Sequence, residues 1–130
     1  MKHSRKYLVK KLDKIFSEYV RKKNMDKNEE VECYTCGKKY HWKKIQCGHF
    51  QSRKFYSTRW ELDNCRPQCY SCNVMRYGEQ YLFGMYLDRE LGKNFSKKML
   101  KKSREIKKFH NFELTELIEK YSTLVSDLDS

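Results

Sequence analysis

Four cysteines in two C-x-x-C pairs are the residues of this sequence that most plainly predict a metal. Cys33 and Cys36 form the first pair, and Cys69 and Cys72 form the second, after thirty-two intervening residues. Thiolates three positions apart both turn inward from one tight turn, and two such pairs supply the four sulfurs of a tetrahedral zinc site. Such a closed shell leaves no open coordination position, so we expect one structural zinc per chain.

One histidine and two asparagines lie between and just after these pairs, at positions where they could hydrolyse a phosphodiester. His49 comes thirteen residues after the first pair, Asn64 five residues before the second, and Asn73 directly after it. A neutral imidazole can take the proton of a water molecule, and a carboxamide oxygen is a hard ligand that suits Mg²⁺ or Mn²⁺. We therefore take these three as candidate catalytic residues. For Asn64, the alternative is a simple turn residue.

Cys47 and Cys65 stand outside the two pairs. The interpretation we favour is two free thiols that pack in the interior, because free cysteine is often buried. The alternative is a second metal that these cysteines share with His41 or His49. Metal stoichiometry separates the two, since one zinc per chain supports the first.

The chain carries 29 Lys and Arg against 17 Asp and Glu, which gives a formal net charge of +12. The bases gather in residues 1–24 and 97–108. A compact protein this basic usually binds a polyanion, so we expect DNA as the partner, with affinity that falls steeply with salt. The alternative is a Lys-rich solvated surface. Candidate phosphate contacts are Arg53, Arg59, Arg76, Lys97, Lys98 and Lys101.

The cellular compartment follows from the N-terminus and the cysteines together. The first residues have no apolar signal core, and no apolar run reaches membrane-spanning length. We therefore expect a cytoplasmic protein that does not bind membranes. In a reducing cytosol, paired C-x-x-C cysteines more often hold metal than form disulfides.

The length of 130 residues predicts a single domain over 1–130, of the α+β class. A basic, amphipathic helix is expected within 1–24, a zinc-containing core over 31–92, and further helices over 96–130. Ser96 is a plausible N-cap for a helix over 97–109. The acidic last helix, which Asn111 could cap, is expected to pack on the N-terminal helix or on a second subunit.

Within the core, residues 31–34 and 39–46 suit the two arms of a hairpin that carries the first cysteine pair. A further strand over 59–62 would bring Asn64 beside His49. After Pro67 the chain should become helical from about Ser71, with another helix ending at Gly92.

The order Cys-x-x-Cys, His, Asn and Cys-x-x-Cys-Asn resembles the zinc-braced His-Asn-His (HNH, ββα-metal) endonucleases. The sequence is still more similar to the phage lambda NinG (Rap) family of recombination nucleases, over most of the chain. The similar segments are Cys33-Tyr-Thr-Cys36-Gly, His41-Trp42, Gly48-His49-Phe50-Gln-Ser-Arg53, Ser57-Thr58-Arg59, Gln68-Cys69-Tyr-Ser-Cys72-Asn73 and Gly78-Glu79-Gln80-Tyr81-Leu82-Phe83-Gly84.

This resemblance implies a treble-clef, zinc-braced ββα-metal (HNH-like) core flanked by N-terminal and C-terminal helices. It implies that His49 is the general base, that Asn64 orients His49, and that Asn73 binds a catalytic Mg²⁺ or Mn²⁺. The implied activity is that of a structure-specific DNA endonuclease encoded by a phage or prophage. It would act on branched recombination intermediates such as Holliday junctions and D-loops, with a phage recombinase as a further partner. Resolving a junction takes two cuts, which favours a homodimer.

One position departs from the HNH pattern. Many HNH enzymes have an Asp or His before the catalytic His as a second metal ligand, and here that position is Gly48. Glu79 is the candidate replacement, if the chain curls back after Gly78. Water or the phosphate could serve instead, and Glu79 could simply be an acid at a helix start, where the helix dipole favours it.

Two other functions fit the same composition. A non-catalytic zinc module could bind DNA for a recombinase or a transcription complex, but it would not need the trio of His49, Asn64 and Asn73. A restriction or homing endonuclease of the HNH type would instead cut linear duplex at a defined sequence. Cleavage of branched and linear substrates separates these alternatives.

Overall fold

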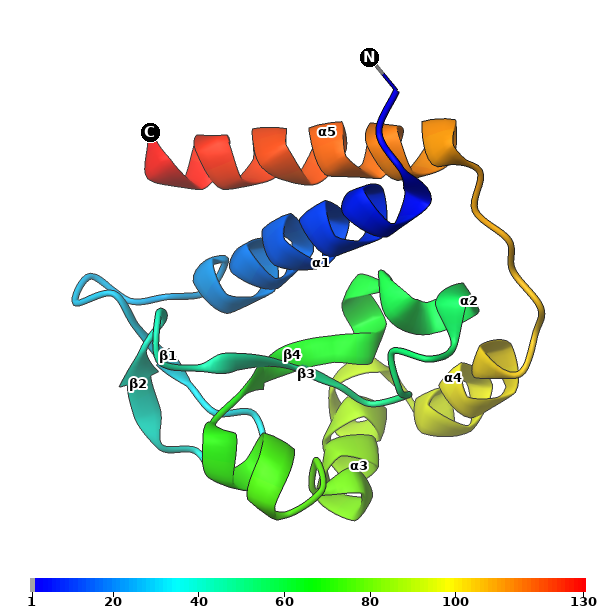
Figure 1. Ribbon diagram of the computed structural model, residues 1–130. Coiled ribbons are helices and arrows are strands. Elements are labelled where there is room, and N and C mark those ends of the chain that lie inside the picture. The colour runs from blue at the N-terminus through cyan, green and yellow to red at the C-terminus, as the bar shows by residue number, and fades with distance from the viewer. Residues whose placement is uncertain (1) are drawn as a thin grey trace.

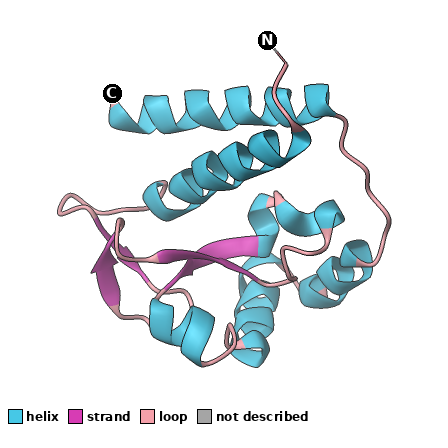
Figure 2. Cartoon of the chain, viewed as in Figure 1, coloured by secondary structure: helices cyan, strands magenta, loops and turns pink. Residues whose placement is uncertain are grey.

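The computed structural model describes residues 2–130, where helices surround two small antiparallel sheets (Figures 1 and 2). This mixed α+β composition is the predicted class. In chain order the elements are α1 (Arg5–Lys22), β1 (Glu30–Glu32), β2 (Lys39–His41), β3 (Gln46–His49), α2 (Tyr56–Arg59), the helical turn η1 (Leu62–Asn64), β4 (Cys65–Gln68), the helical turn η2 (Ser71–Met75), α3 (Gln80–Leu91), α4 (Phe95–Ser103) and α5 (Asn111–Asp129).

The first and last helices lie side by side, on the same side of the β3–β4 sheet (Figure 1). Their main core joins the apolar face of α1 to that of α5, where Phe16 and Tyr121 meet edge to face with ring centroids 5.0 Å apart. Of the two packing partners expected for the acidic last helix, α1 is therefore the observed one. The helix starts one residue earlier than expected, because His110 takes the N-cap position in a capping box with Glu113.

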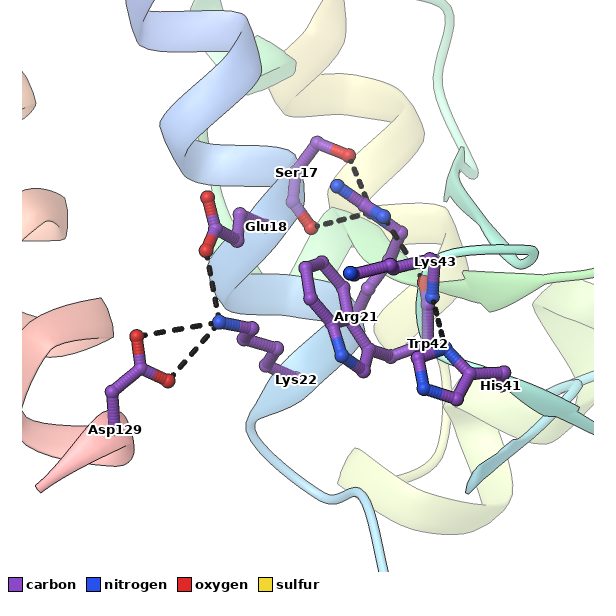
Figure 3. A network of polar contacts seen from close by, with 8 residues as sticks. All are labelled: Ser17, Glu18, Arg21, Lys22, His41, Trp42, Lys43 and Asp129. Carbon is purple, nitrogen blue, oxygen red and sulfur yellow. Dashed lines mark hydrogen bonds and ion pairs between the residues drawn. The ribbon is translucent and has the colours of Figure 1, made fainter. Parts of the chain in front are cut away.

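Lys22, at the end of α1, contacts both α5 and Trp42, the residue after β2 (Figure 3). Its Nζ lies 3.0 Å from both Glu18 Oε2 and Asp129 Oδ1, and 4.3 Å from the centroid of the Trp42 ring. Burial opposes the charge of Lys22, but the two carboxylates outweigh it and raise the pKa of the side chain. The neighbouring Arg21 donates to the carbonyl of Trp42 at 3.0 Å.

Each of the two sheets consists of two antiparallel strands. Strand β1 pairs with β2, and β3 pairs with β4 in a register that sets Cys47 opposite Pro67 and His49 opposite Cys65. The expected strand over 39–46 is thus divided between two sheets. The division falls at a turn after His41, whose carbonyl accepts from the backbone N–H of Lys44 at 2.8 Å.

The predicted strand over 59–62 is wrong, because Arg59 ends the short helix α2 and Leu62 begins the turn η1. Its alternating apolar residues, Trp60 and Leu62, both contact the main core from helical turns. An alternating pattern over so few residues does not separate a strand from consecutive tight turns. The strand that follows is β4, and Asn64, the last residue of η1, directly precedes it.

The helix predicted over 97–109 is shorter and starts earlier, as α4 (Phe95–Ser103) with Asn94 at its N-cap position. Ser96 lies inside the first turn, where its backbone N–H and hydroxyl both donate to the carboxylate of Asp88. Met99 is buried, but Ile106 is fully exposed because it lies in the connection to α5. Helix α3 ends at Gly92, whose φ of 122° suits glycine, as predicted.

Candidate active site and metal centre

The two cysteine pairs meet in space. The four Sγ atoms all lie within 4.8 Å of one another, and none of the cysteines (Cys33, Cys36, Cys69 and Cys72) forms a disulfide. Zinc–sulfur bonds of about 2.3 Å at tetrahedral angles place sulfurs about 3.8 Å apart. The Sγ atoms of Cys36 and Cys69 are 3.8 Å apart. The donor set therefore fits a structural zinc, as the spacing predicted.

Local structure holds these sulfurs in place. The first pair lies in the turn between β1 and β2, where the backbone N–H of Gly37 donates to the carbonyl of Cys33 at 2.9 Å. The second pair follows β4 and enters η2. Although burial opposes the thiolate form, backbone N–H groups of Cys69 and Cys36 lower the pKa of Cys33 to about 6. Burial, with the neighbouring sulfurs, raises the pKa of Cys72 to about 12. Four adjacent thiolates would repel one another, and a divalent cation removes that repulsion.

The His49 ring is oriented by a backbone carbonyl. His49 ends β3, and its Nε2 lies 3.0 Å from the carbonyl oxygen of Arg59. A carbonyl oxygen only accepts, so in the neutral ring Nε2 carries the proton and Nδ1 carries the lone pair. Burial lowers the pKa of His49, and the charge of Arg53 lowers it further. The imidazole is therefore neutral at physiological pH, as a general base must be.

His49 and Asn73 border the same cavity, of about 500 Å³, between α1, β3 and η2. The Nδ2 of Asn73 donates to Gln46 Oε1 at 2.8 Å, which fixes the amide. A larger hollow of about 690 Å³ lies beside the first cysteine pair, but neither His49 nor Asn73 lines it. The smaller cavity therefore carries the candidate chemistry. Its lining residues are Asp13, Phe16, Ser17, Arg21, Ile45, Gln46, Cys47, His49, Arg53 and Asn73.

Asn64 makes its contacts to the backbone rather than to His49. The side chain is fully buried, its Oδ1 accepts from the N–H of Gln51, and its Nδ2 donates to the carbonyls of Gln51 and Thr58, at 2.8 to 3.0 Å. These bonds fix the loop whose next carbonyl, that of Arg59, holds the His49 ring. Any orienting effect of Asn64 on His49 is thus indirect, and it passes through the loop backbone.

Replacing Asn64 by alanine is expected to lower the free energy of unfolding by about 3 kcal/mol, because buried carbonyl and N–H groups lose their partners. The exposed neighbour Asp63 provides the control, since Asp63→Ala should change stability by less than about 0.5 kcal/mol. Urea denaturation of the zinc-loaded proteins measures both. Equal stability of the two variants would contradict the structural role of the Asn64 amide.

The acid that borders the cavity is Asp13, not Glu79. Glu79 takes the N-cap position of α3 without capping it, and its carboxylate lies 3.9 Å from Arg76, outside the cavity lining. The prediction of Glu79 as the second cation ligand is therefore not supported by its position. Asp13 binds the Arg59 guanidinium at 2.6 Å and accepts from the Trp60 indole at 3.0 Å. Its one sequence signal is that it is the only acid in the first seventeen residues.

Packing explains why glycine precedes His49. A Cβ on Gly48 would lie 2.0 Å from Oε1 of Gln68, a fully buried side chain. The amide of Gln68 donates to Thr35 Oγ1 at 3.1 Å and to the carbonyl of Gly78 at 2.9 Å, which links the hairpin turn to the segment after η2. A larger residue at position 48 would displace this link, so the absence of Asp or His there follows from the Gln68 contact.

The predicted DNA-contacting residues divide into two groups. Arg59 is held by Asp13 and by the carbonyl of Arg53, at 2.8 Å, and its side chain is only 14% exposed, so it is a poor phosphate ligand. This correction arises because its ion-pair partner comes from α1, which is remote in sequence. The other five residues are exposed: Arg53 at the cavity, Arg76 after η2, and Lys97, Lys98 and Lys101 on α4.

Cys47 and Cys65 lie next to His49. One ligand atom from each of the three residues lies within 4.8 Å of the others. Burial raises the pKa of the Cys65 thiol well above its ordinary value, with Cys47 adding to the effect. Both cysteines also contact the main apolar core, so the packing interpretation and the metal interpretation remain compatible with their positions.

The sequence model of the family described as "Bacteriophage Lambda NinG protein" matches residues 1–130. The chain belongs to the NinG family. No curated protein and no solved structure shows a significant match to it. In this NinG-family chain the matched region contains both the four-cysteine cluster and the His49 cavity. Over residues 2–130, none of its helices has the length and apolar character needed to span a membrane.

Proposed function

We propose that this NinG-family protein is a divalent-metal-dependent DNA endonuclease of the HNH type that cuts branched recombination intermediates. The observation that carries the proposal is the pairing of a neutral, oriented imidazole with a fixed carboxamide at one cavity. His49 offers the Nδ1 lone pair, and Asn73 reaches the same cavity from η2, directly after Cys72.

The arrangement of elements also supports an HNH-like core. Strands β3 and β4 form an antiparallel pair, with His49 at the end of the first strand, and the chain then enters the helical turn that carries Asn73. A treble clef consists of one cysteine pair in a hairpin turn and a second cysteine pair at the start of a helix. Zinc at the four cysteines would fix Asn73, which is the residue after Cys72, by short-range geometry.

In the proposed reaction, His49 takes a proton from the attacking water through Nδ1, while Nε2 keeps its bond to the Arg59 carbonyl. The water oxygen then bonds to phosphorus, and the bond from phosphorus to the 3′ oxygen breaks. The 3′ oxygen leaves with the bonding electrons and takes a proton from solvent, so the products carry a 5′-phosphate and a 3′-hydroxyl. Asn73 would hold Mg²⁺ or Mn²⁺ through its carboxamide oxygen, since Gln46 engages the amide nitrogen. That cation would neutralise charge on the phosphate and on the departing oxygen. Arg53, at the cavity mouth, is placed to contact a phosphate.

The basic surface supports DNA as the substrate. The net charge is +12, and Lys97, Lys98 and Lys101 are exposed on α4, while Arg76 is exposed just after η2. Phosphate contacts of this kind depend on the course of the DNA backbone and not on the base sequence, which suits recognition of branched DNA. Action on a two-fold junction would suit a homodimer, with one cut from each subunit.

Cleavage of a substrate panel tests the proposal. With Mg²⁺, the zinc-loaded protein should cut a four-way junction or a D-loop at least about tenfold faster than a linear duplex of matched sequence, and EDTA should stop the reaction. Faster cutting of linear duplex at one sequence would favour the restriction or homing alternative. Binding to DNA without cleavage of any substrate would favour a non-catalytic zinc module.

The rate of cleavage is expected to depend on pH through His49. Only the neutral ring accepts a proton, and its pKa is lowered, so kcat/KM should fall on the acid side with a midpoint below about 6.5. Arg53→Gln removes a charge that lowers this pKa and should move the midpoint upward, whatever it does to the rate itself. The pH profiles of both proteins under single-turnover conditions check this. A wild-type midpoint above 6.5 would contradict it.

A further inference from the structure

Three residues that could bind a metal lie on one face of the β3–β4 pair, apart from the four-cysteine cluster. Cys47 and His49 are two positions apart on β3, so their side chains point to the same face of the strand. Cys65 lies directly opposite His49 in the register and shares that face. One ligand atom from each residue lies within 4.8 Å of the others. The strand pairing itself therefore assembles two sulfurs and one nitrogen.

One of these three side chains is fully buried, and the other two border the cavity. Cys65 is only 2% exposed, whereas Cys47 and His49 are half-buried and line the cavity of about 500 Å³. An ion can therefore reach the ligands from the cavity. Cys65 lies behind them at the apolar core, next to α1 and α5.

The His49 ring already has the second hydrogen bond that metal-binding histidines usually make. Its Nε2 donates to the carbonyl of Arg59, which leaves Nδ1 to bind an ion without loss of that contact. Two thiolates and one imidazole form a soft ligand set, which selects Zn²⁺, Co²⁺ or Cd²⁺ over Mg²⁺. With Zn²⁺ and two thiolates the site would be electrically neutral, so the nearby Arg21 does not repel it.

We propose that Cys47, His49 and Cys65 form a second, weaker site for a thiophilic divalent cation such as Zn²⁺, and that its occupation inhibits the enzyme. Three protein ligands leave the fourth tetrahedral position open to water from the cavity. The four-thiolate cluster, with its closed shell, fills first. The inhibition rests on the proposed function, because an imidazole that holds a cation through Nδ1 cannot take a proton from water there.

Cobalt binding tests the site without any need for activity. Protein that already holds one equivalent of zinc is titrated with Co²⁺, and thiolate-to-cobalt charge-transfer absorption is recorded. Wild type should bind one further equivalent with this absorption. Cys47→Ser and Cys65→Ser should each weaken it at least about tenfold, because each removes one thiolate of the three ligands. Ser17→Ala, a change at the same cavity that removes no ligand, should behave as wild type.

Zinc inhibition tests the consequence. Each protein is assayed on a four-way junction in saturating Mg²⁺ with rising free Zn²⁺, and its rate is normalised to its own zinc-free rate. Half-inhibition of Cys47→Ser should need at least about tenfold more zinc than wild type, because loss of one thiolate weakens the site. Absence of thiolate–cobalt absorption in wild type, or cobalt binding by Cys47→Ser that is as tight as in wild type, would overturn the site. Equal zinc sensitivity of the two proteins would overturn the inhibition. If no protein cleaves DNA, the proposed function fails, and the cobalt spectra still decide the site.

Discussion

Cys69→Ser protein is expected to bind almost none of the one zinc equivalent that we expect in the wild-type cluster, and to lose the folded structure around the metal. Cys69 is buried, and its backbone N–H donates to Cys33 Sγ at 3.3 Å, so it links the two cysteine pairs. The apolar cluster at the metal is small, and three of its five buried members are cysteines of the site. A structural zinc contributes about 10 kcal/mol of apparent folding free energy, comparable to the whole stability of a domain.

Zinc content by atomic absorption and thermal unfolding measure this effect. Cys47→Ser is the matched control, since it removes a thiol outside the cluster and should keep the first zinc equivalent. Chelation of wild type should reproduce the loss seen in Cys69→Ser, and added zinc should restore the fold. A Cys69→Ser protein that retains one zinc and melts with wild type would contradict the structural role of the four cysteines.

The parts of the site that follow from local sequence were predictable. Two cysteines three residues apart predict a tight metal-binding turn, whatever the surrounding fold. The four sulfurs do converge in the structure. The apolar face of α1 was visible in the spacing of Leu8, Leu12 and Phe16, and these residues are buried. The likeness of the motifs to the NinG family is confirmed by the match over the whole chain.

Contacts between residues far apart in the chain were not predictable. Asp13 pairs with Arg59 and Trp60 because α1 lies across the β3–β4 sheet, and no pattern within either segment reports that packing. The carbonyl oxygen that orients His49 belongs to the backbone of Arg59. Every residue has such a carbonyl, so the sequence does not indicate this contact. Glu79 was predicted to be a cation ligand because it lies six residues after Asn73 in the sequence. The turn after η2, where Tyr77, Gly78 and Glu79 all have positive φ, instead puts it beside Arg76.

His49→Ala is expected to lower the single-turnover rate of junction cleavage by about 10²- to 10⁴-fold, which is about 3 to 5 kcal/mol of activation free energy. The variant loses the one neutral, oriented imidazole that lines the cavity. Junction affinity should change by less than about threefold, because the loss falls on the chemical step and not on binding. His41→Ala is the matched control. That histidine lies outside the cavity and its Nε2 is 3.8 Å from Glu29.

The decisive measurement is the single-turnover cleavage of one labelled four-way junction in Mg²⁺ by zinc-loaded wild type, His49→Ala and His41→Ala. Wild type and His41→Ala should cut at rates within about threefold of each other, and His49→Ala should be at least about a hundredfold slower with its zinc retained. If His49→Ala holds one zinc, binds the junction and cuts it as fast as wild type, then His49 is not the general base and the proposed active site is wrong.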